Sequence, residues 1–114
     1  MITATVTGNV GKAPELKTTS SGKMMASFSV ASTQKREGRE PQTTWVDVTC
    51  FDEQADVVSQ SVQKGERVVV SGRMQLEKFT RKDGTEGSAL RMLADEVSIS
   101  LRFPKKDREE AMAF

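Results

Sequence analysis

Hydrophobic and polar residues alternate with a period of two over much of the chain, which is the pattern of half-buried β-strands. The alternation predicts five strands, over residues 2–7, 25–32, 43–51, 67–79 and about 89–101. The first strand is expected to break within residues 8–14, because two glycines there permit positive φ and Pro14 removes a backbone donor. Inside the fourth strand, Gly72 is typical of a bend or bulge.

One segment follows a helical period instead. Ala55, Val58 and Val62 recur at helical spacing and predict a single helix over residues 52–62, between the third and fourth strands. Asp52 is expected to cap its first turn, and residues 64–65, Lys-Gly, are expected to end it. Five strands with one helix between strands three and four predict an all-β chain with the OB-fold, a five-stranded partly open barrel.

The third predicted strand has two different faces. Val46, Val48 and Cys50 share one parity and form the expected core side, together with Phe28 of the second strand. Trp45 and Phe51 share the opposite parity with polar residues. Aromatic side chains among polar groups on an outer face indicate a candidate binding surface, although barrel packing or a subunit contact would explain the same pattern.

Two charged loops lie at the expected hairpin tips. The Asp-Gly pair at residues 83–84 is a strong hairpin signal, and the loop at 34–42 contains glycine and proline. The loops of an OB barrel surround its ligand, so their cations are candidate contacts, with a merely solvated surface as the alternative. These cations are Lys35, Arg36, Arg39, Arg81 and Lys82.

The composition excludes several classes of site. The 114 residues contain no histidine and one cysteine, Cys50, so His-based catalysis, disulfides within the chain and Cys-rich zinc clusters are ruled out. The carboxylates fall mostly on the predicted helix and in loops, so we expect no enzyme, no metal and no cofactor. Without an apolar run of membrane-spanning length or a recognisable leader, we expect a cytoplasmic protein with no membrane partner.

Three segments in order resemble the bacterial single-stranded DNA-binding protein family over roughly residues 2–101. They are residues 8–17 (GNVGKAPELK), residues 42–45 (QTTW) with Phe51 following, and residues 64–73 (KGERVVVSGR). The resemblance implies an OB barrel assembled as a homotetramer, which binds single-stranded DNA without strong sequence preference in replication, recombination or repair. It also implies association with the nucleoid.

The resemblance assigns roles to individual residues. Trp45, Phe51 and Phe79 match aromatics on which bases stack, and Arg36 stands where relatives often have another aromatic, so its guanidinium could stack on a base. Lys17, Lys64 and Lys78 match commonly basic positions. The expected phosphate contacts are therefore Lys17, Lys35, Arg39, Lys64, Arg73, Lys78, Arg81 and Lys82.

The chain also departs from the family pattern. Glu53, Gln75 and Glu77 stand where relatives often carry Lys or Arg. Relatives continue into a long tail with an acidic tip that recruits replication and repair enzymes. Here we expect one domain over residues 1–103 and a short, polar, disordered tail over residues 104–114, without that recruitment.

The formal charge of +1 conceals an uneven distribution. Residues 52–66 hold four carboxylates and one lysine, a net −3, whereas the tail from residue 104 is neutral, which leaves +4 on the rest of the barrel. This modest charge predicts that stacking carries a large share of DNA affinity and that binding is either weaker or less sensitive to salt than in a typical relative.

Two other functions fit the same features. A primosome-type accessory protein is also a short OB domain, but it is dimeric and acts mainly through protein partners. A structural OB subunit or inhibitor would use the aromatic face to dock a protein.

Overall fold

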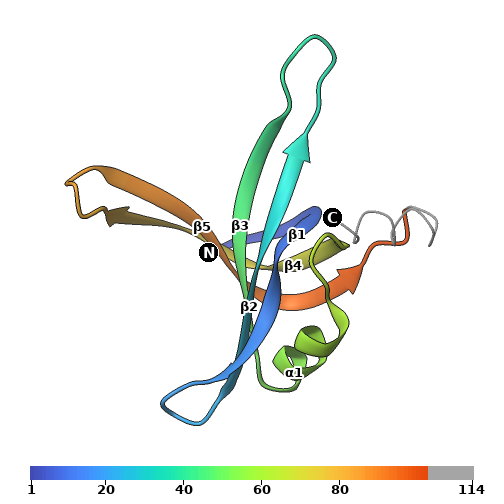
Figure 1. The fold of residues 1–114 in the computed structure, drawn as a ribbon, viewed down its shortest axis with the longest axis vertical. Coiled ribbons are helices and arrows are strands. Elements are labelled where there is room, and N and C mark those ends of the chain that lie inside the picture. Colours follow the sequence, from blue (N-terminus) through green and yellow to red (C-terminus); the bar gives the residue numbers. More distant parts are fainter. Residues whose placement is uncertain (103–114) are drawn as a thin grey trace.

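The computed structural model of the protein describes residues 1–102 (Figure 1). Its elements in chain order are β1 (Ile2–Thr18), β2 (Met24–Gln34), β3 (Gln42–Phe51), α1 (Asp52–Ser61), β4 (Arg67–Thr80) and β5 (Glu86–Ile99). The five predicted strands are present, and the helix lies between β3 and β4. The all-β OB prediction is therefore confirmed.

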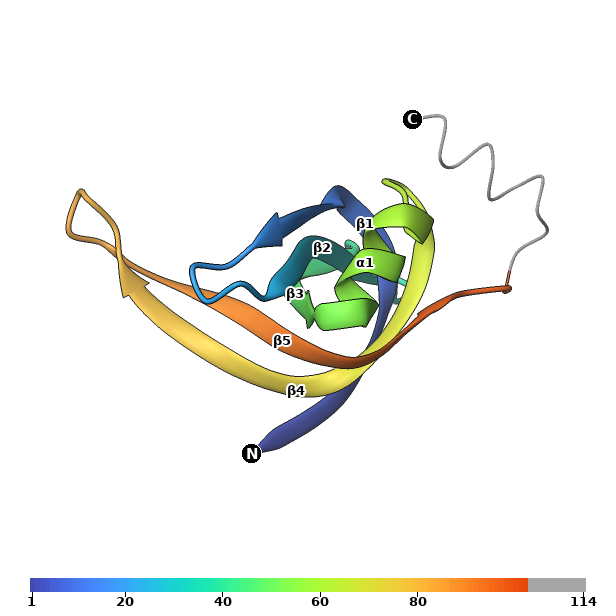
Figure 2. The same ribbon diagram turned by 90° about the horizontal axis from the view of Figure 1, so that it is seen from below.

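The strands form a closed barrel in the order β1–β2–β3–β5–β4. Neighbouring strands are antiparallel except β3 and β5, which pair in parallel through residues 46–49 and 90–93. This parallel contact joins the two ends of the sheet, so the barrel is closed where we expected a partly open one. Three hairpins, β1–β2, β2–β3 and β4–β5, extend from the barrel in different directions (Figure 1, Figure 2).

The inward positions of the strands form the core. It contains Val46, Val48 and Cys50 of β3, Phe28 of β2 and Met92 of β5, each at most 3% exposed. Burial raises the pKa of the Cys50 thiol to about 11, because a thiolate is poorly solvated there. The thiol is therefore protonated at neutral pH and packs as a small apolar group.

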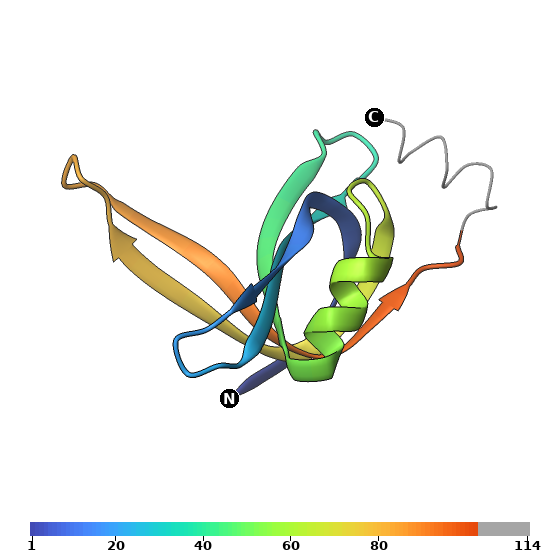
Figure 3. The same ribbon diagram turned by 60° about the horizontal axis from the view of Figure 1, so that its bottom comes forward.

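The helix packs against β1, β2 and β3 beside the barrel (Figure 3). Ala55 and Val58 are its buried residues, as the helical spacing predicts. Between β4 and β5, a Cβ on Gly72 would lie 3.0 Å from Cα of Ala94. The β4–β5 register also shifts between Ser71 and Gly72. The predicted bend in β4 is therefore confirmed, and only glycine fits that approach of the two backbones.

The predicted break in the first strand is wrong. β1 continues through residues 8–14 and changes partner on the way, pairing with β4 through residues 2–9 and with β2 through residues 9–18. Register shifts between Val10 and Lys12 and between Lys12 and Glu15 take up the extra residues. Such bulges bend a strand without ending it, so the glycines and Pro14 mark a bend and not a loop.

The helix spans nearly the predicted range, but the residues predicted to cap it and to end it are wrong. Asp52 is the first helical residue, with φ of +59°, and Phe51 occupies the N-cap position without a side-chain hydrogen bond. The helix ends at Ser61, and the N–H of Val62 donates to the carbonyl of Val58. Gly65 instead forms the turn into β4, with φ of +87° and its N–H donating to the carbonyl of Val10.

Residues 104–114, where we predict a polar tail, lie outside the described residues. Within residues 1–102, no helix has the length and apolar character needed to cross a membrane.

Candidate nucleic-acid interface

β3, β5 and β4 lie side by side in that order and share one outward surface, which we call the outer face. Val48 pairs with Met92 and Met92 pairs with Met74, so these inward residues are in register across the three strands. The residues that alternate with them along each strand point away from the core. The outer face contains Trp45, Asp47, Thr49 and Phe51 of β3, Gly87, Ala89, Arg91 and Leu93 of β5, and Arg73, Gln75, Glu77 and Phe79 of β4.

All three predicted stacking aromatics lie on the outer face. Trp45 is 54% exposed and Phe79 is 40% exposed, while Phe51 is partly buried. The shared parity of Trp45 and Phe51 predicts this common orientation on β3. The position of Phe79 on the same surface depends on β5 pairing with both β3 and β4.

The indole ring of Trp45 lies against the backbone of Gly11. Trp45 pairs with Ala31 of β2, whereas Gly11 belongs to β1, so the ring extends across β2. A Cβ on Gly11 would lie 2.7 Å from Cη2 of Trp45 and closer still to Cζ3. Glycine at this position therefore allows the ring to lie low over the sheet with part of its surface open to solvent.

The ring of Phe79 is also positioned by a glycine. Gly87 is its partner on β5, and a Cβ there would lie 2.6 Å from Cζ of Phe79. The guanidinium carbon of Arg81 lies 5.4 Å from the ring centroid, within the range of a cation–π contact. Arg81 also donates from Nη1 to the carbonyl of Glu86 at 2.8 Å, so its side chain is held by its own hairpin.

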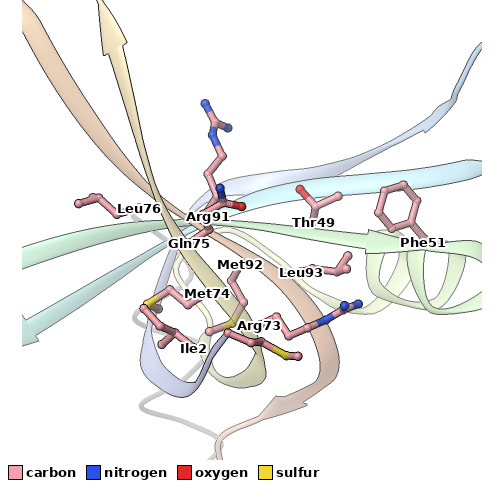
Figure 4. A pocket seen from close by; sticks show the side chains of 11 residues that line it. Ile2, Thr49, Phe51, Arg73, Met74, Gln75, Leu76, Arg91, Met92 and Leu93 are labelled. Atoms are coloured by element: carbon pink, nitrogen blue, oxygen red, sulfur yellow. The ribbon is translucent and has the colours of Figure 1, made fainter.

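A groove of about 790 Å³ opens beside Phe51 (Figure 4). Six of its lining residues belong to the outer face: Thr49, Phe51, Arg73, Gln75, Arg91 and Leu93. Its lining also includes Met1 and Ile2 from the start of β1. The groove thus combines an aromatic ring, two guanidinium groups and apolar side chains, which suits a ligand with both flat apolar and anionic parts.

The predicted cations divide by position. Lys17 pairs with Met25, which pairs with Phe51, so Lys17 lies in the same cross-strand row as that ring. It is 3.8 Å from a carboxylate oxygen of Glu15. Arg73 lines the groove. These two cations, and Arg81 beside Phe79, are therefore brought to the surface that carries the aromatics.

The other predicted cations lie elsewhere. Lys35, Arg36 and Arg39 are in the loop between β2 and β3, where both arginines line a small hollow, and Lys82 is in the turn between β4 and β5. Lys78 alternates with Phe79 on β4 and so points from the opposite face. Lys64 follows α1, beside the turn at Gly65 that bonds to Val10.

Several residues of the site are not identified by the sequence analysis. Gly11 and Gly87 support two rings, Lys23 places Nζ 5.5 Å from the Phe51 ring centroid, and Arg91 lies at the centre of the outer face. Arg91 occupies an outward position by simple alternation, but its neighbours depend on the strand order. In residues 1–102 there is no group of three His, Cys, Asp or Glu side chains able to hold a metal ion.

Replacing Gly11 with alanine tests the contact beneath Trp45. Gly11 lacks the positive φ that would exclude alanine, so the added methyl group must displace the indole. We expect stronger quenching of the single tryptophan's fluorescence by acrylamide, with the free energy of unfolding changed by less than about 1 kcal/mol. Unchanged quenching would show that the ring does not depend on Gly11.

Comparisons with known proteins agree with this fold. The sequence model of the single-strand binding protein family matches residues 1–100. A single-stranded DNA-binding protein of Paenarthrobacter aurescens is 36% identical over 107 residues, covering 89% of this chain and 63% of that protein. One from Mycobacterium tuberculosis is 34% identical over 107 residues, covering 89% of this chain and 65% of that protein. The chain thus spans less than two thirds of these relatives.

A solved structure is similar over nearly the whole of its own length. The crystal structure of the small single-stranded DNA-binding protein from Streptomyces coelicolor matches with a TM-score of 0.76 and 25% sequence identity. The match covers 88% of this chain and 94% of that one. The five-stranded barrel and the position of its helix agree with the family match over residues 1–100. This chain therefore belongs to the single-strand binding protein family.

Proposed function

We propose that the outer face binds single-stranded DNA without strong sequence preference. The observation that carries this proposal is that Trp45, Phe51 and Phe79, which are far apart in the sequence, share one surface. Stacking on aromatic rings suits sequence-independent binding, because every base has a π-face. The names of the curated relatives, which are single-stranded DNA-binding proteins, support the same function.

In this mechanism the protein acts by binding and not as an enzyme. Bases stack on Trp45, Phe51 and Phe79, while Lys17 and Arg73 neutralise phosphates beside them. The cations of the loops, including Arg36 in a stacking role, extend the path beyond the barrel. The corresponding role in the cell is protection and organisation of single strands during replication, recombination or repair.

The first test is titration of the protein with poly(dT), followed by Trp45 fluorescence. Trp45 is the only tryptophan, so the signal reports one ring. A base stacked on that ring is expected to quench it at low salt, and added salt is expected to reverse the quenching as counterions compete for phosphates. The DNA-binding proposal fails if no quenching occurs and a labelled oligo(dT) shows no change in anisotropy.

Single substitutions separate stacking from charge. Trp45→Ala is expected to weaken oligo(dT) binding by about 1–3 kcal/mol with little change in the salt dependence. Lys17→Ala is expected to reduce the slope of log K against log salt by about 0.7, the value for one phosphate contact on a single strand. Lys78→Ala is the matched variant on the other face of β4. For each lysine variant, a reduced slope shows that the lysine contacts a phosphate, and an unchanged slope shows that it does not. The affinity of all three variants is measured by fluorescence anisotropy of labelled oligo(dT).

We further propose that the protein is a homotetramer. In the barrel, β1 pairs with β4 through residues 2–9 and with β2 through residues 9–18, so the other edge of residues 2–7 has no paired strand within the described chain. Ile2 at this end is 61% exposed, and Leu76, close by on β4, is 52% exposed. An open strand edge beside exposed apolar side chains favours pairing with another copy.

Light scattering tests the assembly. Four chains of 12.5 kDa give a particle of about 50 kDa. A particle of about 25 kDa would contradict the tetramer and favour the primosome-type accessory protein, which is dimeric. Lys substituted for Ile2 should reduce the mass of the particle if this edge is the contact, with Thr3→Lys on the other parity as the control.

A further inference from the structure

Arg91 is the one Lys or Arg residue of β5, and it lies at the centre of the outer face. It is paired with Asp47 on β3 and with Gln75 on β4. Its side chain lines the groove beside Phe51, where Figure 4 shows it extending away from the ribbon. About half of the side chain is exposed to solvent.

The strand order places Arg91 on the route between the aromatics. Trp45 and Phe51 are on β3 and Phe79 is on β4, and β5 lies between these strands. Neighbouring strands in a sheet are about 4.8 Å apart, so a DNA strand that stacks on both sets of rings must cross β5. Arg91 lies close to this crossing, because it pairs with Asp47, which stands between Trp45 and Phe51 on β3.

In the free protein, the guanidinium of Arg91 is shared between two carboxylates. Its Nε forms an ion pair with Glu77, and its Nη1 lies 3.9 Å from a carboxylate oxygen of Asp47. All three side chains are about half exposed. Together Arg91, Asp47 and Glu77 carry a net charge of −1. While these ion pairs are formed, the three side chains do not attract phosphate.

We propose that Arg91 is a phosphate-binding residue whose charge is withheld by Asp47 and Glu77, and that these carboxylates compete with DNA for its guanidinium. This inference rests on the proposed DNA-binding function of the outer face. When the strand binds, phosphate replaces the carboxylates as the partner of Arg91. The carboxylates are then left facing the strand, and they lower the affinity.

The exchange is physically accessible because the ion pairs are exposed. Water screens such pairs, and they contribute little to stability. Phosphate offers a guanidinium two parallel hydrogen bonds, a geometry in which arginine binds anions strongly. After the exchange, Asp47 and Glu77 still repel the phosphate. This repulsion lowers the affinity of the outer face for DNA below what its three aromatic rings would otherwise provide.

The test measures oligo(dT) affinity and its salt dependence by anisotropy in four proteins. They are the wild type, Asp47→Asn/Glu77→Gln, the same double variant with Arg91→Gln, and the control Asp56→Asn. The control removes a carboxylate from the second turn of α1, which is not part of the outer face. Thermal unfolding and Trp45 emission verify that each variant is folded.

Removing Asp47 and Glu77 is expected to tighten binding about fivefold or more at low salt, because fivefold is the effect of a single unit charge about 4 Å from a phosphate in water and this variant removes two. The control is expected to tighten it much less, because the interaction between two exposed charges weakens with their separation and is screened by salt. Adding Arg91→Gln to the tightened variant should reduce its salt slope by about 0.7, the loss of one phosphate contact.

Three results would overturn the proposal. The first is no tightening beyond the control, which would mean that the carboxylates do not compete with DNA. The second is an unchanged salt slope when Arg91→Gln is added, which would mean that Arg91 only neutralises its neighbours. The third is no oligo(dT) binding by the wild type, and this result is distinct because it rejects the proposed function as well.

Discussion

The short parallel pairing of β3 with β5 is the contact on which the rest of the structure depends. It involves only residues 46–49 and 90–93, yet it joins the two ends of the sheet and closes the barrel. Closure gives every strand an inner side that forms the core and an outer side that is free. It also inserts β5 between β3 and β4, and this order brings Phe79 onto the surface that carries Trp45 and Phe51.

Glycines then determine how the aromatic side chains lie on that surface. A large ring on a sheet usually stands above its neighbours, because their Cβ atoms occupy the space beside it. Gly11 and Gly87 remove this obstacle under Trp45 and beside Phe79. Gly72 acts within the barrel, where it lets β4 and β5 approach as β4 bends. The same residue type thus serves both the closure of the barrel and the exposure of the rings.

Electrostatics on the outer face is balanced and not strongly positive. Arg81 is tied to its own hairpin and Arg91 to two carboxylates, so part of the positive charge on this side is already paired within the chain. Exposed pairs of this kind are weak and are easily exchanged for other partners. A surface of this type favours contacts through aromatic rings over attraction by net charge.

Alternation and helical spacing are local properties, so the sequence alone predicts the strands, the single helix, the inward set on β3 and the shared orientation of Trp45 and Phe51. It predicts the helix caps and the course of β1 incorrectly, since a strand that changes partners and a helix without a side-chain cap depend on contacts with distant residues. The residues that meet across strands are known only from the folded barrel. The contacts of Trp45 with Gly11 and of Arg91 with Asp47 and Glu77 follow from strand order and register, which no local pattern encodes.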